Sequence, residues 1–455
     1  MILKGGTHTA HNLTTTAGSV FTHTSGILQI RRNYTNSGFY SGSTGTVKFI
    51  GADSATITND HVSSKFYKVE FGSGVAKTIA IGGSTPFTTT NTATIKALAE
   101  VRIPAGSRWN AEGKSLVTLA TGALKVNGGT LALGSVAAPS PAFNSKGRLE
   151  LVGPSCNNVA LLTSGNGLAR CNLKIAGPFN GRNFRMEYPQ KNGMDFRSTT
   201  RIEDFAYGAF DYPMTEGKLL DFTGISLAKF APALIQGAQV LLNDLAFGNT
   251  AGVANAKNVG ANGGTATITI AAYSGALGGP TFEVDPKNRI TWHNAAGPVL
   301  TAPTSGLKTF DTTPTATGTA PANASIRIYD CGILVATTAA SGTGNFSVPV
   351  NTLSDGNHSL TAKVVTGGLE SQSSNAVTLT VDTTPPATPG DLQVIQYASH
   401  NLIQWTAPAD ADLLGYVIYR KTGEFGAYAR LHPANQLIPA ATTQYFDTTV
   451  TVPTN

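Results

Sequence analysis

Charged residues are scarce in this sequence. They make up 13% of its 455 residues, about half the roughly 25% typical of a soluble domain, whereas hydrophobic residues make up 41%. Disorder normally accompanies high charge and low hydrophobicity, so this balance predicts a folded chain. The three cysteines include no Cys-x-x-Cys pair and are too few for a disulfide scaffold. Their scarcity excludes the common zinc ribbons, thioredoxin-like chemistry and c-type haem attachment.

Long apolar runs are also missing. No stretch approaches the roughly 18 uninterrupted apolar residues of a membrane-spanning helix, so we expect no transmembrane segment. The opening residues 1–6 lack the apolar core of an export signal, which leaves a cytosolic chain or a mature or excised part of a longer one. The net charge of +6 comes from Lys and Arg that form no dense run. We therefore expect no nucleic-acid partner.

Patterns of helical period are nearly absent, which weakens every α/β enzyme interpretation. The sequence contains neither a Gly-x-x-x-x-Gly-Lys-Ser/Thr loop for a nucleotide nor a Gly-x-Ser-x-Gly nucleophile elbow. We predict that the chain is not an enzyme, and we assign no catalytic residue.

Short segments of alternating apolar and polar residues, closed by Gly, fill the chain instead. Four examples are Gly45–Gly51, Lys77–Gly83, Ala123–Gly129 and Gly147–Gly153. A period of two over four to seven residues predicts strands joined by tight turns, so the fold class is all-β.

Residues 1–292 carry these strands at intervals of roughly 8–12 residues, without hairpin signals. Two architectures are compatible with this pattern, a stack of sandwiches and a β-solenoid (β-helix-like) rod. Sandwiches tend to bury a Trp in each domain-sized block, and only Trp109 and Trp292 occur here. The strand–turn unit therefore favours a solenoid, in which each coil stacks on the next.

The first region also resembles large, repetitive exported bacterial surface proteins. In those proteins an Asn-Trp-Thr-Asn-x-Gly segment precedes Gly-Thr-Val-x-Phe-x-Gly, often with Trp at the place of Tyr34. The resemblance is carried by Leu28–Gly38, Gly45–Gly51, Phe66–Phe71 and the closing segment Gly279–Trp292. It implies an extracellular or cell-surface protein.

Two further modules follow by resemblance. Residues 293–306 have the composition of a linker, and residues 307–382 resemble a bacterial Ig-like β-sandwich. In this module Ile326, Ile328 and Tyr329 begin a central strand, and residues 330–332 form its turn. Residues of the module that carry the resemblance are Thr313–Pro321, Ile326–Asp330, Gly344–Val348, Leu353–Ala362 and Val381–Pro386.

After a linker at residues 383–390, residues 391–455 resemble a fibronectin type III β-sandwich with Trp405 in its core. The matching segments are Leu392–Ile395, Leu402–Trp405, Gly415–Arg420 and Tyr445–Asp447. This sandwich is incomplete, because two further strands are expected after Asn455. Either the polypeptide continues, which we favour, or a neighbour supplies the strands by β-augmentation.

The cysteines Cys156 and Cys171 lie on what can be neighbouring coils. In an exported protein they are candidates for a disulfide, and the alternative is two buried free thiols. Cys331 falls at the predicted turn of the Ig-like module. We expect it to be exposed and unpaired, with an intermolecular bond as the less favoured alternative.

The window from Arg182 to Phe222 is the richest in charged and aromatic residues. Carboxylates beside Tyr and Arg suit saccharide binding, so Arg197, Tyr207 and Tyr212 are candidate glycan contacts. Hydrolysis would need a facing pair of carboxylates. Asp195, Glu203, Asp204 and Asp211 are the carboxylates to test. The plainer alternative is a solvated face with aromatic residues in the core.

Metal sites are not predicted. His8, His11 and His23 lack a neighbouring carboxylate or Cys and are expected to be polar surface. The cofactor prediction is none, with one less favoured alternative. Calcium could stiffen the ends of the Ig-like module, where the available carboxylates are Asp311, Asp330, Asp355 and Asp382, although they are not clustered in sequence.

These observations predict an extracellular structural protein that forms or decorates a bacterial fibre, sheath or surface layer by β-rich self-association. The alternative is a surface adhesin or glycan-binding protein that contacts cell-surface or matrix components through the Arg182–Phe222 window.

Overall fold

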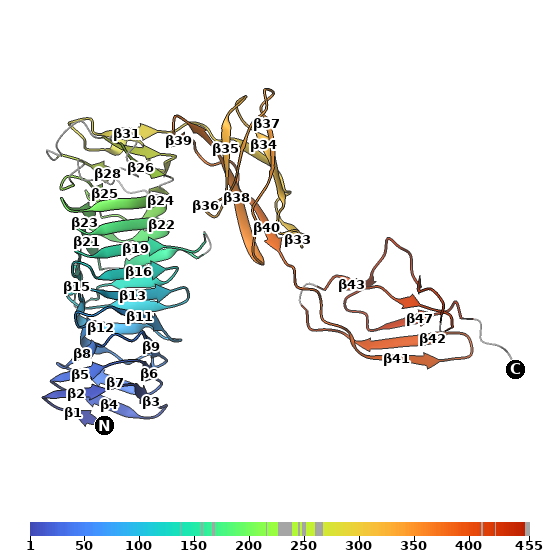
Figure 1. The fold of residues 1–455 in the computed structure, drawn as a ribbon, viewed down its shortest axis with the longest axis horizontal. Coiled ribbons are helices and arrows are strands. Elements are labelled where there is room, and N and C mark those ends of the chain that lie inside the picture. The colour runs from blue at the N-terminus through green and yellow to red at the C-terminus, as the bar shows by residue number, and fades with distance from the viewer. Residues whose placement is uncertain are drawn as a thin grey trace. The chain divides into compact units, whose positions relative to one another are not determined.

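The computed structural model describes residues 1–136, 138–155, 158–165, 169–214, 216–225, 239–243, 246–247, 252–259, 267–410, 413–423 and 425–450, without the side chains of Cys171 and of residues 239–247. The chain forms two compact units, Met1–Val381 and Asp382–Asn455. The described residues contain strands and one short 3-10 turn, Pro280–Phe282, but no α-helix (Figure 1). The all-β prediction is confirmed.

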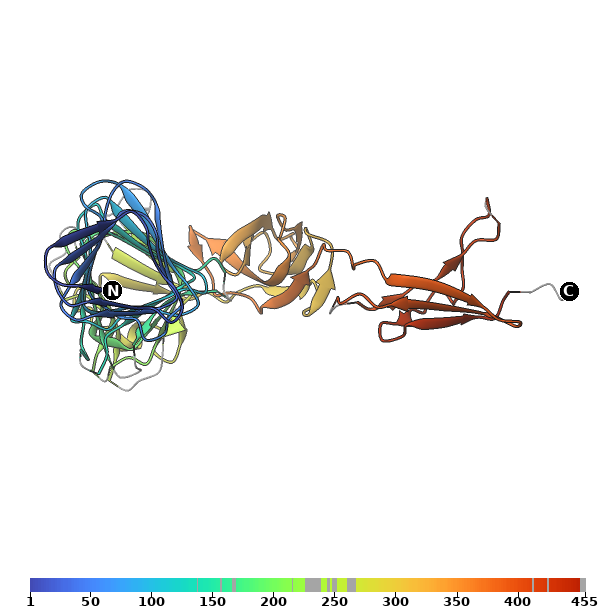
Figure 2. The ribbon, with the colours of Figure 1, turned by 90° about the horizontal axis from the view of Figure 1, so that it is seen from below.

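The first region is a β-solenoid of about 11 turns. Its strands stack in three parallel ladders, which are the three faces of each coil (Figures 1 and 2). Face 1 contains β1 (Ile2–Leu3), β4 (Val20–His23), β7 (Phe39–Gly42), β14 (Arg108–Ala111), β17 (Thr130–Leu133), β20 (Ala160–Ser164), β27 (Ala246–Phe247) and β30 (Ser274–Gly275).

Face 2 contains β2 (Thr7–Ala10), β5 (Ile27–Ile30), β8 (Thr46–Phe49), β10 (Phe66–Phe71), β12 (Phe87–Ile95), β15 (Ser115–Thr118), β18 (Ala142–Ser145), β21 (Cys171–Ile175), β23 (Pro189–Phe196), β25 (Lys218–Asp221) and β28 (Ala254–Lys257). Face 3 contains β3 (Leu13–Thr15), β6 (Tyr34–Asn36), β9 (Ala55–Asn59), β11 (Lys77–Gly82), β13 (Ala99–Pro104), β16 (Ala123–Asn127), β19 (Arg148–Val152), β26 (Gln239–Asn243), β29 (Thr267–Ala271) and β31 (Ile290–His293). Two long strands, β22 (Pro178–Glu187) and β24 (Arg201–Asp211), turn from face 3 onto face 1. The strand β12 turns in the same way from face 1, where it pairs with β14, onto face 2, where it pairs with β15.

The strand–turn unit seen in the sequence is one face of a coil, and three such units complete a turn. Equivalent residues of successive coils are therefore just over 20 positions apart. Thr9 and Gln29 are separated by 20 residues, and Asn36 and Asn59 by 23. The parallel pairing confirms the solenoid over a stack of sandwiches, whose strands pair mainly in antiparallel ladders.

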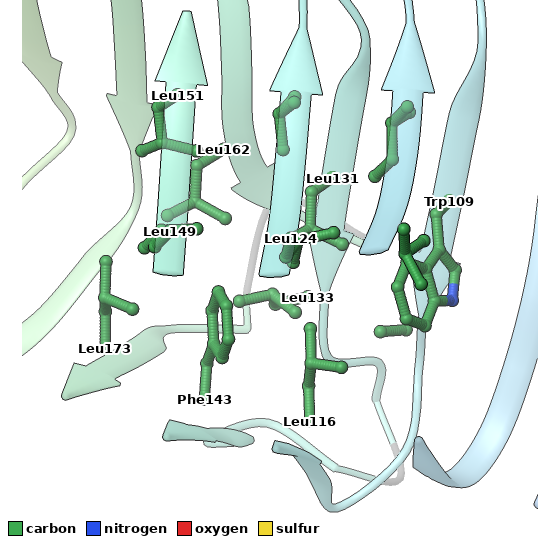
Figure 3. Close-up of a cluster of buried hydrophobic side chains, with 14 of the residues drawn as sticks. Trp109, Leu116, Leu124, Leu131, Leu133, Phe143, Leu149, Leu151, Leu162 and Leu173 are labelled. Carbon is green, nitrogen blue, oxygen red and sulfur yellow. The ribbon is translucent and has the colours of Figure 1, made fainter. Parts of the chain in front are cut away.

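The solenoid core follows from the alternation of side chains along each strand. In β16, Leu124 and Val126 are buried while Lys125 between them faces out. Figure 3 shows Leu124, Leu131 and Phe143 converging on the interior from strands of different faces. Each coil alone leaves its apolar side chains open along the axis, so stacking is what buries them.

A polar stack runs through one corner of the N-terminal coils. The hydroxyl of Thr15 donates to Asn36 Oδ1. Asn36 Nδ2 donates in turn to Asn59 Oδ1 at 2.7 Å and to Ser64 Oγ at 2.9 Å. Because these side chains are buried, each hydrogen bond offsets the cost of removing an amide from water.

The second module of the first unit is a β-sandwich. One sheet contains β32 (Val299–Ala302), β34 (Thr315–Thr319) and β37 (Asn345–Pro349). The other contains β33 (Leu307–Thr309), β40 (Val377–Val381), β38 (Gly356–Thr366), β35 (Ser325–Asp330) and β36 (Ile333–Ala339), with β39 (Leu369–Glu370) beside β38. Ile326 and Ile328 of the predicted central strand are fully buried. The sandwich begins at β32, so the linker predicted at residues 293–306 is too long, because Leu300 is buried in the sandwich core.

The second unit has a smaller core. Its sheet contains β41 (Gly390–Gln396), β42 (Asn401–Thr406) and β47 (Gln444–Asp447). Two pairs lie beside it, β43 (Gly415–Tyr416) with β46 (Ile438–Pro439), and β44 (Tyr419–Arg420) with β45 (Ala429–Arg430). Trp405 packs edge-on against Tyr416 with ring centres 5.0 Å apart, which confirms it as a core residue. An apolar groove of about 410 Å³ remains open next to this pair.

Candidate functional site

The three candidate glycan contacts lie at three different corners of the solenoid. Tyr207 lies where β24 turns from face 3 to face 1. Tyr212 lies just beyond the end of β24, at the corner between faces 1 and 2, and Arg197 follows β23, at the corner between faces 2 and 3. The structure therefore does not bring these three side chains together.

Residues with positive φ make the corners of β22 and β24. Asn183 has a φ of 49° and Tyr207, one coil further on, has a φ of 51°. Tyr188 and Tyr212 repeat this relationship at the next corner, with φ values of 55° and 51°. Such left-handed conformations are uncommon for residues other than Gly, and bulky residues adopt them only where the surroundings hold them.

The corner formed by Asn183 and Tyr207 contacts the β-sandwich of the first unit, and we name it the sandwich corner. Asn183 Nδ2 donates to the carbonyl oxygen of Cys331 at 2.8 Å. Arg182 donates from Nη1 to the carbonyl oxygen of Gly332 at 2.9 Å, and it binds both carboxylate oxygens of Asp204 at 2.7 and 3.0 Å. A bidentate pair fixes the orientation of the guanidinium group, so Asp204 positions Arg182 for the contact with the turn.

Aromatic rings and a buried charge form the other part of this contact. The Tyr207 and Tyr329 rings lie 5.9 Å apart. Lys363 Nζ lies 4.8 Å from the Tyr207 ring centre and 5.8 Å from that of Tyr329. The Lys363 side chain is 0% exposed, and its Nζ is 3.6 Å from Glu370 Oε2. A cation desolvated over aromatic faces gains more than it does at an exposed site.

Glu370 neutralises the cations at the sandwich corner. Burial alone would raise its pKa, but the hydrogen bond from Tyr329 and the charges of Lys363 and Arg327 lower the pKa below its usual value. Burial, followed by the contact with Glu370, raises the pKa of the Tyr329 hydroxyl far above its ordinary range. Tyr329 therefore acts as a neutral hydrogen-bond donor and Glu370 as an anion at neutral pH.

Cys331 is buried, with 6% of its surface exposed, and it is disulfide-bonded. The prediction of an exposed, unpaired thiol is therefore wrong, because the turn that carries Cys331 packs against the solenoid instead of facing solvent. The side chains of Cys156 and Cys171, predicted to bond with each other, lie outside the described residues.

The Tyr188 and Tyr212 rings stack at 4.8 Å with an interplanar angle of 12°. Arg170 lies over the Tyr188 ring at 5.6 Å and donates to the carbonyl oxygen of Tyr212. Tyr212 is 55% exposed. This corner therefore presents an aromatic surface to solvent. Nearby, Arg185 of β22 and Asp211 of the neighbouring strand β24 form an ion pair at 2.6 Å.

Each of the four carboxylates proposed for a test of catalysis is paired with an arginine. Asp204 binds Arg182, Asp211 binds Arg185, and Asp195 binds Arg197. Glu203 accepts from Arg148 and Arg201. Burial raises the pKa of Asp195 although Arg197 opposes the shift. Burial also acts to raise the pKa of Glu203, but the hydrogen bonds and charges of Arg148 and Arg201 outweigh it and lower the pKa below its usual value.

The residues considered for metal binding are dispersed. His23 is buried in the solenoid, where Nδ1 lies 2.9 Å from the Tyr40 hydroxyl, so the expectation that it is a surface residue is wrong. Asp330 faces His358 at 2.7 Å. Within the described part of the chain, no three His, Cys, Asp or Glu residues are placed to share a metal ion.

Sequence reasoning missed Asn183 and Lys363. The spacing of the corners could have singled out Asn183, because Asn tolerates a left-handed conformation better than most residues. No local signal marks Lys363, which lies in an alternating strand among apolar neighbours.

The strand pairings establish the class of fold, an all-β chain in which a β-solenoid precedes β-sandwich sheets. No protein-family model matches the chain. No curated protein matches it either. Among solved structures, the chain is similar to the FN1–FN3 domains of chicken CNTN1, with 13% identity, a TM-score of 0.25, and coverage of 37% of this chain and 60% of that one. The chain thus spans less than two thirds of that structure. In the described part of the chain, no helix has the length and apolarity needed to cross a membrane.

Proposed function

We propose that the chain is an extracellular structural protein that forms or decorates a bacterial fibre, sheath or surface layer through β-rich self-association. The observation that carries the proposal is the outer edge of the first coil. Among the described residues, β1, β2 and β3 each pair with one neighbouring strand only. Unpaired strand edges are templates for pairing with another chain.

The geometry of β2 identifies the groups available at this edge. Ile27 N–H of β5 donates to the Gly6 carbonyl, directly before β2. Along a parallel strand, the N–H and C=O groups of successive residues point alternately to one side of the strand and to the other. The peptide groups of Thr7 and Thr9 therefore point away from β5. Both side chains are exposed, and neither carries a charge that would discourage pairing.

Two further features support the proposal. The disulfide of Cys331 suits an oxidising compartment, as expected for an exported protein. In the second unit, β43 and β44 each have one partner among the described residues and line the apolar groove beside Trp405, which suits the addition of strands.

Electron microscopy and sedimentation over a range of concentrations test this function. Filaments or sheets with a regular subunit repeat, formed without added ligand, support it. Thr7→Lys with Thr9→Lys should reduce assembly, because lysines on a free edge block pairing. The control is Thr56→Lys with Thr58→Lys on β9, a strand already paired on both sides. Isolated rods at high concentration would exclude self-assembly as the main role.

The second candidate is a surface adhesin that binds glycans, and the Tyr188–Tyr212 stack favours it. Exposed aromatic rings bind the apolar faces of sugars, and the neighbouring Arg185 and Asp211 offer hydrogen bonds. A polysaccharide binding screen tests it. Tyr212→Ala should abolish binding while Arg197→Ala, at a different corner, leaves it intact. Equal effects of the two substitutions, or no binding by the wild type, would exclude this site.

A further inference from the structure

A small hollow of about 280 Å³ lies on the outside of the solenoid, where face 2 meets face 3. It is formed at the ends of β18, β21 and β23, and part of its lining comes from Val117 of β15. Its lining includes three cations, Lys146, Lys174 and Arg197, and no carboxylate. We name it the cationic hollow.

The register of face 2 explains why the cationic hollow forms. The last residues of β18, β21 and β23 are aligned with one another, so the residues that follow them, Lys146, Ala176 and Arg197, stack in three consecutive coils. The short side chain of Ala176 leaves a gap between the two cations, whose backbones are two strand spacings, or on the order of 10 Å, apart. Lys174 borders the gap from the middle coil, because alternation places it on the same side of the chain as Ala176.

The three cations are available to a ligand. Lys146 is exposed and Lys174 is half-buried, and neither forms an ion pair with the residues that the structure describes. Arg197 binds Asp195 through Nη2, which orients the guanidinium group, while its buried Nε has no hydrogen-bond partner in the described part of the chain. Asp195 offsets one of the three positive charges, so the cationic hollow retains an excess of positive charge.

The arrangement of the lining residues favours one class of anion. Cations at successive coils suit a polymer with a negative charge on successive units, whereas a single small ion reaches only one coil. The Asn144 amide makes no side-chain hydrogen bond to the described residues, so it can donate to and accept from hydroxyl groups. No aromatic ring lines the cationic hollow, so the bases of a nucleic acid would have no surface on which to stack.

We propose that the cationic hollow binds an acidic polysaccharide, with the carboxylate or sulfate groups of neighbouring sugars placed against Lys146, Lys174 and Arg197. Hydrogen bonds between such ionised groups are stronger than those between neutral groups. This site goes beyond the proposed self-association and does not depend on it. It is also separate from the Tyr188–Tyr212 stack, which lies at another corner and offers aromatic rings to the uncharged faces of sugars.

Binding of the full chain to immobilised polysaccharides tests the proposal. The probes are polygalacturonate, which carries carboxylates, dextran sulfate, which carries sulfates, and dextran, which is neutral. We expect binding to one or both acidic polymers, which identifies the group that is recognised, and this binding should weaken as salt is added. Lys146→Ala with Lys174→Ala should weaken it by at least about tenfold, because two charge-assisted contacts are lost.

The matched control is Lys191→Ala with Lys308→Ala. Both lysines are exposed and form no ion pair within the described residues, so this variant loses the same net charge away from the cationic hollow. Equal losses of binding in the two variants would overturn the proposal, because net charge alone would then explain the attraction. Three results with the wild type would also overturn it: binding to neither acidic polymer, equal affinity for dextran, or equal affinity for single-stranded DNA.

Discussion

Lys363 Nζ of the sandwich lies 4.8 Å from the centre of the Tyr207 ring of the solenoid. Two modules that the sequence presents as separate are joined by this contact within one compact unit. The contact also changes the interpretation of Tyr207. A residue singled out for binding sugars instead packs against both a buried cation and the ring of Tyr329.

Removal of the Tyr207 ring should loosen the attachment of the sandwich. We expect Tyr207→Ala to lower the free energy of unfolding by about 1–2 kcal/mol, because a desolvated cation–π contact is lost. Broad-specificity proteolysis of residues 294–298 should become faster. Tyr212→Ala is the control, since its ring faces solvent. Equal cleavage rates for the two variants would show that Tyr207 does not hold the junction.

The His358–Asp330 pair should make the sandwich less stable as the pH rises. Burial lowers the pKa of His358, but the hydrogen bonds to Asp330 and to the Ser354 carbonyl outweigh it and raise the pKa above 6.5. The stabilisation is therefore complete below about pH 6.5 and is lost as the pH passes through the raised value. Urea unfolding between pH 5.5 and 8.5 should show this loss for the wild type, and His358→Gln should remove that part of the pH dependence. An unchanged profile in the variant would contradict the assignment.

Adjacent residues of β16 should differ sharply in their effect on stability. Leu124→Ala removes a fully buried side chain from the solenoid core and should cost about 2–5 kcal/mol. Lys125→Ala removes a partly exposed side chain that pairs with Glu100 and Glu150, and it should cost less than about 1 kcal/mol. Thermal unfolding of the two variants compares them directly. Similar losses would mean that the alternation is misassigned.

Gly113 should be intolerant of a side chain, because the coils stack closely at its corner. A Cβ at this position would lie 1.8 Å from the carbonyl oxygen of Asn91 in the preceding coil. We expect Gly113→Ala to destabilise the solenoid by more than about 1 kcal/mol, because the backbones of the two stacked coils would have to move apart. Gly82→Ala, where the nearest atom is 3.9 Å away, is the matched control and should be close to neutral. Circular dichroism melts measure both.

Part of the fold could be predicted because strand patterns are local. The alternation of Ile326 and Ile328 predicted a central strand, and both residues are fully buried in the sandwich. The role of Trp405 could be predicted for the same reason, because a large apolar residue in an alternating strand faces a core. The length of a coil could not be predicted from the sequence, because it depends on the varied segments at the corners, such as those around Asn59 and Asn183.

The sites were less predictable, because they depend on which corners face one another. Tyr207 and Tyr212 are close in sequence but lie at different corners, whereas Asn183 and Cys331 are in contact although 148 residues separate them.

By itself, the sequence determined the all-β class, the strands and their inward residues, and the order of the three regions, because period-two alternation and turn residues act over a few neighbouring positions. Only the tertiary structure decided the three-faced coil, the contact of Lys363 with Tyr207 and the burial of Cys331. Those features depend on the register with which coils stack and on contacts between residues far apart in the chain, and their free energy arises only when both surfaces are already formed.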